Sequence, residues 1–307
     1  MKRSSRQPRT TVVIVTYRSM GVVNRALEAL EPIAREGAVA CTVVDNASDD
    51  GTAAYVREEH PWVRLLEGRG NVGFGRGCNA GLARAETEFV LFLNPDAVIS
   101  YESLLTLERF FDEHDGAGLI APAVAFEDGG YQPVRPLPTP LGVLAGEGGF
   151  ALGSTEQIPV WPGAEPFPVE WLCGAVLMGR RQLLDDLDGF DPRFFMYFEE
   201  TDLCVRARQA GAELWMVPGA EASHTSGASA ERSDARLWSG CIAEYYFESR
   251  HYYLTKHYGR LAACGATLGE IALMAARTLL DRVRGRGSSR LQYRLKAPVL
   301  RLPAHLG

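Results

Sequence analysis

Several features that define other classes of protein are missing from this chain of 307 residues. Its six cysteines include no Cys-x-x-Cys pair, which argues against a zinc site or a redox motif and favours reduced, buried thiols. No secretory signal is expected, because residues 1–9 are basic and polar and the apolar run 12–15 is too short. No stretch is expected to be long and apolar enough to span a bilayer, so the composition predicts an ordinary soluble globular protein.

An excess of positive charge is also missing, since the net charge is −6, and this argues against general nucleic-acid binding. The charge is uneven, however. Residues 277–307 contain eight Arg or Lys and one Asp, so this end carries +7 and the remainder carries −13. A basic tail on an acidic body suggests an anionic surface as partner.

What the first hundred residues do contain is an alternation of strand and helix patterns. Apolar runs of strand length occur at 11–17, 41–45, 63–66 and 89–93. Residues 24–34 have helical spacing, and the glycine-rich run 68–81 forms a loop that opens another helix. This alternation predicts an α/β fold with a parallel sheet and right-handed crossovers.

The second half has a less regular pattern. Strands are expected at 119–126, 169–178 and 213–217, and helices at 181–187, 203–209 and 237–258. Residues 127–168 are rich in Gly and Pro without clear periodicity, which is typical of a functional loop or lid. His224 is expected in a loop of Ser, Gly and Ala, where it is a surface histidine, a core histidine or a metal ligand.

The predicted fourth strand ends in Asn94-Pro95-Asp96, and this stretch organises the chemistry that the sequence suggests. An open α/β sheet binds its ligand beyond the carboxyl ends of its strands. Oxygen ligands two residues apart suit a hard divalent cation, which in turn suits a phosphate. The alternative is an ordinary turn, because Asn and Asp are common turn residues.

The first two strands also end in polar residues. Thr16 and Tyr17 end the first, and Asp45 ends the second, where a carboxylate commonly holds a ribose or a base edge. The alternative for Asp45 is a helix cap, a role that Asp49 can take instead. The glycines of 68–81 follow the third strand rather than the first, so they match the dinucleotide fingerprint weakly. They allow a backbone to approach a ligand closely, or they form only a flexible loop.

Glu199, Glu200 and Asp202 lie together at a predicted helix start, directly after an aromatic run. Acidic residues stabilise a helix N-terminus, which is the structural explanation. The neighbouring rings favour a second explanation, in which an apolar environment makes one carboxylate a catalytic base.

Together, these segments resemble the family 2 glycosyltransferases of the GT-A fold, and among them the bacterial rhamnosyltransferase-like members. The resemblance covers roughly residues 10–260. It rests on Val-Thr-Tyr at 15–17, Val-Val-Asp-Asn-Ala-Ser-Asp-Asp-Gly-Thr at 43–52, Asn-Val-Gly-Phe-Gly-Arg-Gly-Cys-Asn at 71–79, Leu-Asn-Pro-Asp at 93–96, Gly-Ala at 174–175, Gly-Phe-Asp-Pro-Arg-Phe-Phe-Met-Tyr-Phe-Glu-Glu-Thr-Asp-Leu-Cys at 189–204, and His224 with Ser229.

The resemblance implies a role for each matching residue. The nucleotide-sugar would be bound by Thr16, Tyr17, Asp45, Asn46, Asn71, Gly73, Asn79 and Asn94. A divalent cation, Mg²⁺ or Mn²⁺, would be held by Asp96, Asn94 and His224. The family usually has two aspartates in its metal motif, and the Asn at the first position favours Asp96 as the direct ligand. Glu200 stands where the family has its base, usually Asp, so Glu199 and Asp202 remain alternatives.

The acceptor platform is expected to include Trp171, Gly174, Tyr197 and Phe198, because sugar faces stack on aromatic rings; core packing is the alternative. The C-terminal segment 261–284 places Leu268, Ile271, Ala275, Leu279 and Val283 on one helical face. This face is expected to meet either the membrane surface, close to a lipid-linked acceptor, or protein, including a second subunit.

The resemblance thus implies a cytoplasmic enzyme that can also bind the inner face of the cell membrane. It would be an inverting, metal-dependent glycosyltransferase of surface-polysaccharide or cell-wall biosynthesis. It would move a sugar, with rhamnose as one candidate, from a dTDP- or UDP-sugar to a glycan or lipid-linked acceptor. The alternative is a catalytically silent sugar-nucleotide-binding or scaffold protein, suggested by the departures at Asn94 and Glu200. Three parts are expected: a disordered tail (1–9), a GT-A catalytic domain (10–235) and C-terminal helices (236–307). The catalytic domain would have a mostly parallel sheet, with a nucleotide-binding half up to residue 100 and an acceptor half from residue 101.

Overall fold

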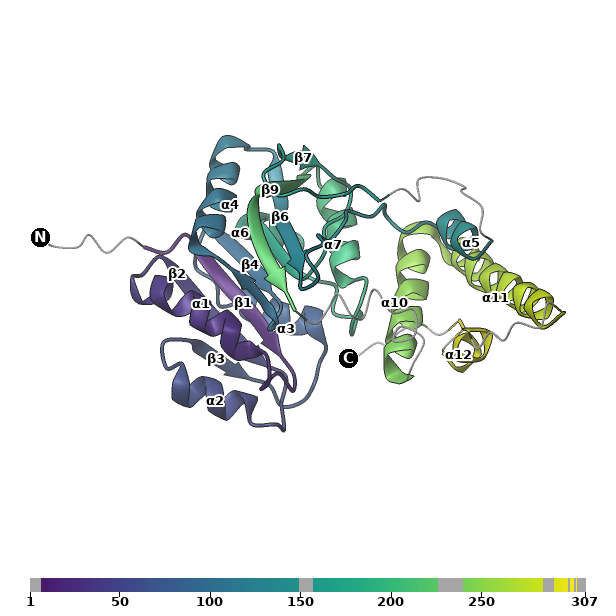
Figure 1. Cartoon of the computed structure of the whole chain (residues 1–307), viewed down its shortest axis with the longest axis horizontal. Helices are drawn as coiled ribbons and strands as arrows, with labels where there is room; N and C mark the ends of the chain where they lie inside the picture. Colours follow the sequence, from purple (N-terminus) through teal and green to yellow (C-terminus); the bar gives the residue numbers. More distant parts are fainter. Residues whose placement is uncertain are drawn as a thin grey trace, which may run out of the picture. The chain divides into compact units, whose positions relative to one another are not determined.

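The computed structural model describes residues 7–148, 157–225, 240–283, 290–297, 299–300 and 302 (Figure 1). The chain divides into two compact units. The first comprises residues 1–134, 158–192 and 200–228, and the second comprises residues 135–157, 193–199 and 229–307. Most of the predicted tail, residues 1–6, and Ser229 of the family resemblance lie outside the described residues.

The first unit is built on one sheet with strand order β3-β2-β1-β4-β8-β6-β9-β5, and β7 pairs with β9. β1 (Thr10–Thr16), β2 (Val39–Asp45), β3 (Arg64–Glu67) and β4 (Phe89–Leu93) are parallel, which confirms the pattern predicted for the first hundred residues. The rest of the sheet is mixed. β8 (Val176–Arg180) runs antiparallel between β4 and β6 (Ala117–Phe126), while β6 and β9 (Glu213–His224) are parallel. β5 (Ala97–Ile99) and β7 (Phe167–Pro168) run antiparallel to β9.

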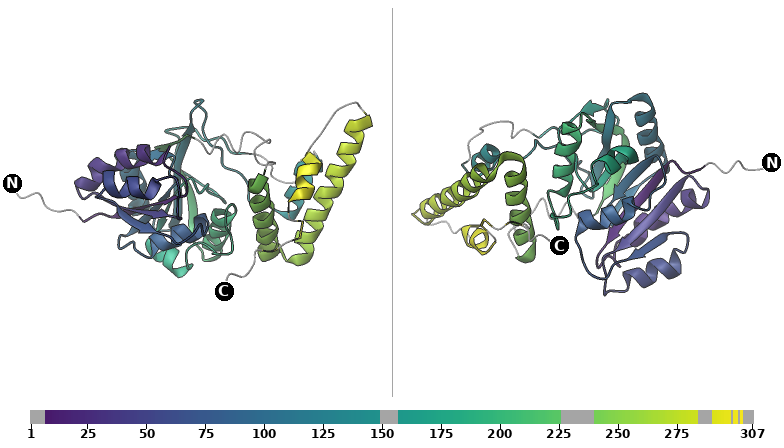
Figure 2. Two further views of the ribbon diagram at one scale, coloured as in Figure 1. Left: turned by 90° about the horizontal axis from the view of Figure 1, so that it is seen from below. Right: turned by 180° about the vertical axis from the view of Figure 1, so that it is seen from behind.

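Helices cover both faces of this sheet (Figures 1 and 2). α1 (Val23–Arg35) and α4 (Tyr101–Glu113) share one hydrophobic core with Val12 and Ile14 of β1. α3 (Phe74–Leu82) packs on the alternate residues of the same strand. α2 (Thr52–Glu59) lies beside β3, and α6 (Arg181–Asp186) lies beside β8.

Two glycines of α3 explain part of the glycine-rich run. A β-carbon on Gly77 would lie 2.6 Å from Val15 Cγ1, and one on Gly81 would lie 2.3 Å from Val13 Cγ1. These positions therefore let the helix approach β1, a role that neither sequence interpretation of the run had considered.

The second unit is helical. It contains α5 (Pro140–Gly148), α10 (Gly240–Tyr258), α11 (Arg260–Val283) and α12 (Arg290–Lys296), and residues 193–199 belong to it as well. α7 (Glu199–Gln209) begins with the last residue of that segment and continues in the first unit. Inside the second unit, the buried Glu270 of α11 bonds both Arg250 of α10 and Arg294 of α12.

Several local predictions were wrong. Residues 127–168 include helix α5 and strand β7, which the glycine-rich composition concealed. The strand predicted at 169–178 begins only at Val176, so Trp171 and Gly174 lie in irregular backbone. β9 continues to His224, which is therefore a strand residue rather than a loop residue. α11 is long and apolar enough to cross a membrane by length and composition, contrary to expectation, although a core helix of a soluble protein passes the same test.

Candidate active site

The turn after β4 brings the three predicted metal-binding side chains together. β5 follows this turn directly and pairs with β9, so that Ala97 lies opposite His224. His224 Nε2 lies 2.9 Å from Asp96 Oδ1 and 3.3 Å from Asn94 Nδ2. The carbonyl oxygen of Asp96 accepts hydrogen bonds from the amide and the hydroxyl of Thr225, at 3.1 and 3.0 Å. The pairing of β5 with β9 and the bonds from Thr225 thus fix this turn.

A carboxylate oxygen and an imidazole nitrogen are suitable ligands for Mg²⁺ or Mn²⁺. Within the described residues, no three His, Cys, Asp or Glu side chains gather into a metal cluster. Asp96 and His224 could therefore hold a cation only with further oxygens, which a diphosphate and water can supply. The amide nitrogen of Asn94 faces His224, so ligation through its oxygen requires the amide to turn over.

Asp45 is the buried centre of the predicted nucleotide site, with 2% of its surface exposed. Its Oδ1 accepts hydrogen bonds from the hydroxyls of Thr16 (2.8 Å) and Ser48 (2.6 Å), and its Oδ2 accepts one from the Ser48 amide (2.8 Å). A carboxylate has about four acceptor sites, so these three bonds leave capacity for a ligand. Tyr17, next to Thr16, is 43% exposed.

The cap predicted for Asp49 is wrong in detail. Asp49 instead pairs with Arg18 at 2.7 Å, and this guanidinium lowers the pKa of the Asp49 carboxyl below its ordinary value. At the start of α2, Asp50 Oδ1 accepts a hydrogen bond from the Thr52 amide at 3.1 Å. Asp45 is free of the capping role, as the prediction required.

The asparagines near the glycine run bond the backbone of neighbouring loops. Asn46 Nδ2 donates to the carbonyl of Gly73 at 3.0 Å, and Asn71 Oδ1 accepts from the Gly73 amide at 3.1 Å. Asn79 bonds both the amide and the carbonyl of Phe190, at 2.8 and 2.7 Å. In this structure Asn79 therefore fixes the loop that precedes residues 193–199.

Glu200 is oriented by a short chain of hydrogen bonds. The indole nitrogen of Trp171 donates to Thr201 Oγ1 at 3.0 Å, and Thr201 Oγ1 lies 3.3 Å from Glu200 Oε1. A β-carbon on Gly174 would lie 3.2 Å from the β-carbon of Glu200, so the glycine leaves room for the carboxylate's stem. Trp171 and Gly174, predicted for the acceptor, thus both support Glu200.

The other two candidate carboxylates have different surroundings. Asp202 is fully buried, and its Oδ2 accepts a hydrogen bond from Arg206 Nε at 2.7 Å. Arg206 also donates to the carbonyls of Leu187 and Gly189. Glu199 is buried and belongs to the second unit, as do Tyr197 and Phe198 of the predicted acceptor platform.

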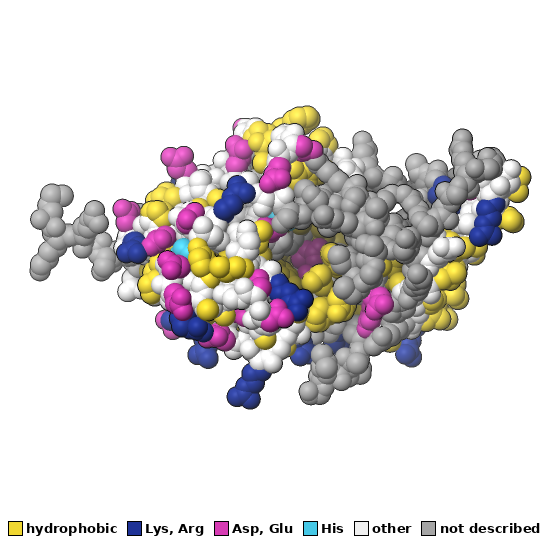
Figure 3. Space-filling view, turned by 60° about the horizontal axis from the view of Figure 1, so that its bottom comes forward, with side chains coloured by type: hydrophobic (Ala, Val, Ile, Leu, Met, Phe, Trp, Pro, Cys, Tyr) yellow, Lys and Arg dark blue, Asp and Glu magenta, His cyan; other side chains and the backbone are white. Residues whose placement is uncertain are grey.

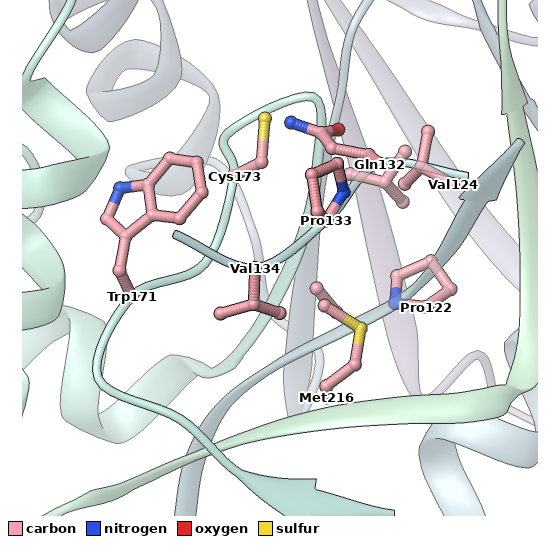
Figure 4. A pocket seen from close by; sticks show the side chains of 10 residues that line it. Pro122, Val124, Gln132, Pro133, Val134, Trp171, Cys173 and Met216 are labelled. Atoms are coloured by element: carbon pink, nitrogen blue, oxygen red, sulfur yellow. The ribbon is translucent and has the colours of Figure 1, made fainter. Parts of the chain in front are cut away.

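The metal turn and Glu200 adjoin the same loop of the first unit. The Asn94 amide donates to the Ala175 carbonyl at 2.9 Å, and a β-carbon added to the neighbouring Gly174 would lie 3.2 Å from the β-carbon of Glu200. A small pocket lined in part by this stretch of chain has a cavity volume of only about 10 Å³ (Figure 4). Apolar side chains dominate its lining, with the amide of Gln132 and the thiol of Cys173 as the exceptions, so it does not suit a diphosphate.

Sequence reasoning missed three residues that organise the site: Ser48, Thr201 and Arg206. Each lies within four residues of a predicted carboxylate. Ser48 follows Asp45 by three residues, a spacing at which a hydroxyl can bond back to a strand-end carboxylate. Arg206 follows Asp202 by four residues, which is the spacing of an ion pair on a helix.

The chain is similar to known proteins. Residues 11–167 match the family model described as glycosyl transferase family 2. The chain is 31% identical over 249 residues to the N-acetylglucosaminyl-diphospho-decaprenol L-rhamnosyltransferase of Mycobacterium tuberculosis, covering 73% of this chain and 78% of the relative. It is 27% identical to the rhamnosyltransferase WbbL of Escherichia coli, covering 69% and 82%.

Solved structures support the same fold. GalNAc-T7 with UDP, GalNAc and Mn²⁺ superposes with a TM-score of 0.60 at 13% identity, over 94% of this chain and 56% of that chain. S. aureus TarS in complex with UDP-GlcNAc superposes with a TM-score of 0.54 at 19% identity, over 90% and 74%. The GT-A-type fold predicted from the sequence is confirmed. The family match and the rhamnosyltransferase relatives establish that the chain belongs to glycosyl transferase family 2, as an enzyme of rhamnosyltransferase-like type.

Proposed function

We propose that this enzyme transfers a sugar, with inversion, from a nucleotide-sugar to a hydroxyl of a lipid-linked glycan acceptor in surface-polysaccharide or cell-wall biosynthesis. The observation that carries the proposal is that the Asp96–His224 pair and Glu200 lie at one loop. Ala175 of this loop accepts a hydrogen bond from Asn94 of the metal turn, and Gly174 leaves space beside Glu200. Rhamnose from a dTDP-linked donor is the sugar we favour, because two relatives are named as rhamnosyltransferases.

In this proposal the donor's nucleoside lies against Thr16, Tyr17 and Asp45, at the carboxyl ends of β1 and β2. Asn46, Asn71, Gly73 and Asn79 shape the adjoining loop. Asp96 and His224 hold a divalent cation, with Asn94 beside them. When bound, that cation neutralises the charge that develops on the departing diphosphate.

Glu200 is the proposed base. Its carboxylate takes the proton of the acceptor hydroxyl as the oxygen attacks the anomeric carbon, while the bond from that carbon to the diphosphate breaks. A single displacement of this kind inverts the anomeric carbon, and it does not need a second catalytic carboxylate. Glu200 is favoured over Asp202 because Asp202 is fully buried and bonded to Arg206.

A transfer assay with a panel of dTDP- and UDP-sugars, with and without Mn²⁺, tests this proposal. We expect product of the anomeric configuration opposite to the donor's, formed only with a divalent cation. Glu200→Gln should lower kcat by about 100- to 10,000-fold, the range of general-base catalysis. Asp96→Ala should lose the response to Mn²⁺, while the fold, checked by circular dichroism, persists.

Full activity of both variants would overturn the proposal. Metal-dependent nucleotide binding without turnover of any donor would favour the alternative, a catalytically silent sugar-nucleotide-binding or scaffold protein. Binding without turnover is measurable by thermal shift, since a ligand at 100 times its Kd adds about 2.7 kcal/mol of stability.

We further propose that α11 touches the cytoplasmic membrane surface, where a lipid-linked acceptor resides. Its buried face packs within the second unit, through residues such as Ala266, Glu270 and Met274. The opposite face is an exposed, uncharged stripe along the whole helix, formed by Leu261, Leu268, Ala272, Ala275, Leu279 and Val283. Leu261 and Val283 at its two ends are 91% and 80% exposed.

Figure 3 shows hydrophobic side chains along the part of the molecule where α11 lies, with basic side chains near its end. Arg282 lies beside the stripe near its end, and residues 277–307 carry +7. An apolar stripe next to clustered positive charge suits an anionic lipid surface better than it suits a second copy of the same basic helix.

Co-sedimentation with vesicles tests this contact. The wild-type protein should bind phosphatidylglycerol vesicles strongly and phosphatidylcholine vesicles only weakly. Leu279→Glu should abolish binding, and Ile158→Glu, at an exposed apolar residue of the first unit, should not. The membrane proposal fails if the wild type does not bind vesicles and is instead a dimer that Leu279→Glu dissociates. The stripe would then be a subunit contact.

A further inference from the structure

The segment that leads into the proposed base has an unusual backbone. Residues 193–199, here called the aromatic turn, include Tyr197 at φ +68° and Phe198 at φ +66°. Neither residue is a glycine, and the left-handed region is unfavourable for residues that carry a β-carbon. Two such residues in succession persist only when the surrounding structure holds them there.

Helix α10 provides that support within the second unit. Ser249 Oγ donates a hydrogen bond to the carbonyl of Met196 at 2.8 Å, directly before the left-handed pair. The ring of Tyr246 lies 5.8 Å from that of Tyr197 and 5.3 Å from that of Phe198, between ring centroids. One side chain therefore contacts both residues of the strained pair.

The neighbouring contacts come from the same side of α10. Tyr245 stacks on Phe195 at 4.5 Å, and Tyr253 lies 5.5 Å from Phe198. Residues 245, 246, 249 and 253 follow the spacing of one helical face. The rings of the aromatic turn are thus engaged with α10, which competes with their predicted role as a sugar platform.

We propose that α10 positions the catalytic carboxylate, with Tyr246 and Ser249 as its positioning residues. The inference rests on the proposed function of Glu200. The backbone itself makes the connection. Helix α7 begins at Glu199, immediately after Phe198, so the φ angles of the left-handed pair set the course of the backbone into Glu199 and Glu200. If the pair relaxed to negative φ, the carboxylates would leave the turn in a different direction.

A matched pair of substitutions tests whether the backbone conformation is the feature that matters. Phe198→Ala and Phe198→Gly remove the same ring, and they differ only in the β-carbon. Glycine adopts positive φ without the steric cost, so it should keep more of the productive turn. We expect kcat of the alanine variant to be about tenfold lower than kcat of the glycine variant, with equal donor KM. Equal kcat values would overturn the proposal.

Substitutions in α10 test the helix itself. Tyr246→Leu should lower kcat at least about fivefold and leave donor KM unchanged, because the nucleotide residues lie on other elements. Tyr246→Phe should restore kcat, since the contacts are made by the ring. Tyr252→Leu is the matched control, because Tyr252 contacts Phe194, outside the strained pair. A kcat loss in Tyr252→Leu as large as in Tyr246→Leu would mean that general packing, and not positioning, is the cause.

Hydrogen exchange separates a failure of this inference from a failure of the proposed function. Even if no donor is turned over, the amides of residues 197–200 should exchange faster in Tyr246→Leu than in Tyr252→Leu. Unchanged exchange in Tyr246→Leu would overturn the positioning role independently of any activity.

Discussion

The two units of this chain are stabilised by different kinds of contact. In the first unit, strands of Val, Ile, Leu and Phe form the core, and all five residues of β4 are buried. Its polar residues at the strand ends bond one another, as Asp45 does with Thr16 and Asp96 does with His224. The second unit depends on aromatic rings and on Glu270, buried between two arginines. Strand register therefore fixes the metal turn, whereas side chains of a distant helix hold the aromatic turn.

The largest effect that would test this difference is expected at Glu270. Glu270→Gln leaves Arg250 and Arg294 buried without their shared counter-charge, which should cost about 3–5 kcal/mol of unfolding free energy. Urea unfolding of the full chain should show the loss in the transition of the second unit. Glu244→Gln, at an exposed position of α10, should change stability by less than about 0.5 kcal/mol. An equally small change at Glu270 would show that the ion pairs of Glu270 do not stabilise the second unit.

The same difference explains which parts of the fold the sequence could predict. Strands β1, β2 and β4 are continuous apolar runs, and the residues that end them were identified correctly, because local pattern determines both. β5 was missed because three residues after a turn carry no pattern of their own. α5 was missed because its glycines and apolar residues have no helical period, and its helix depends on packing against α11.

For the candidate site, the sequence located residues but not their contacts. Asp96 and His224 are 128 residues apart, and only the pairing of β5 with β9 shows that they adjoin. The contact between the aromatic turn and α10 likewise joins residues far apart in the sequence, so no periodicity could reveal it. The roles of Trp171 and Tyr197 as acceptor residues stay predictions.

The next largest effect is expected in the first unit. Gly81→Ala places a β-carbon against Val13 on a rigid strand, and overpacking of this kind should cost about 1–3 kcal/mol. The matched control is Gly265→Ala in α11, where no atom beyond the adjoining residues and the helix's own backbone lies within 4 Å of the added carbon. That change should stabilise the helix by up to about 1 kcal/mol. Denaturant unfolding of both variants measures the difference, and a neutral Gly81→Ala would show that the sheet unit is less tightly packed than we infer.

A smaller effect is expected from the hydrogen-bond chain at Glu200. Thr201→Val keeps the shape of the side chain but leaves the Trp171 indole and Glu200 without the bridging hydroxyl. We expect kcat to fall about tenfold, the scale of one hydrogen bond to a charged group, with donor KM unchanged. Thr201→Ser should retain near-wild-type kcat. If Thr201→Val is fully active, the first unit does not orient the base, and the contacts of α10 would carry that role alone.

The smallest effect concerns pH and the second unit. Burial, together with Arg294 and Arg250, lowers the pKa of His251 below its ordinary value of 6.5. Above pH 6.5 the imidazole is neutral in both the folded and the unfolded chain. Below it the unfolded chain takes up a proton that the folded chain resists, so the free energy of unfolding should fall as the pH drops from 6.5. Urea unfolding at pH 7.5, 6.5 and 5.5 should show this decline, and His251→Gln should reduce it. A decline of the same size in His251→Gln would mean that other groups cause the pH response. The lowered pKa inferred for His251 would then be wrong.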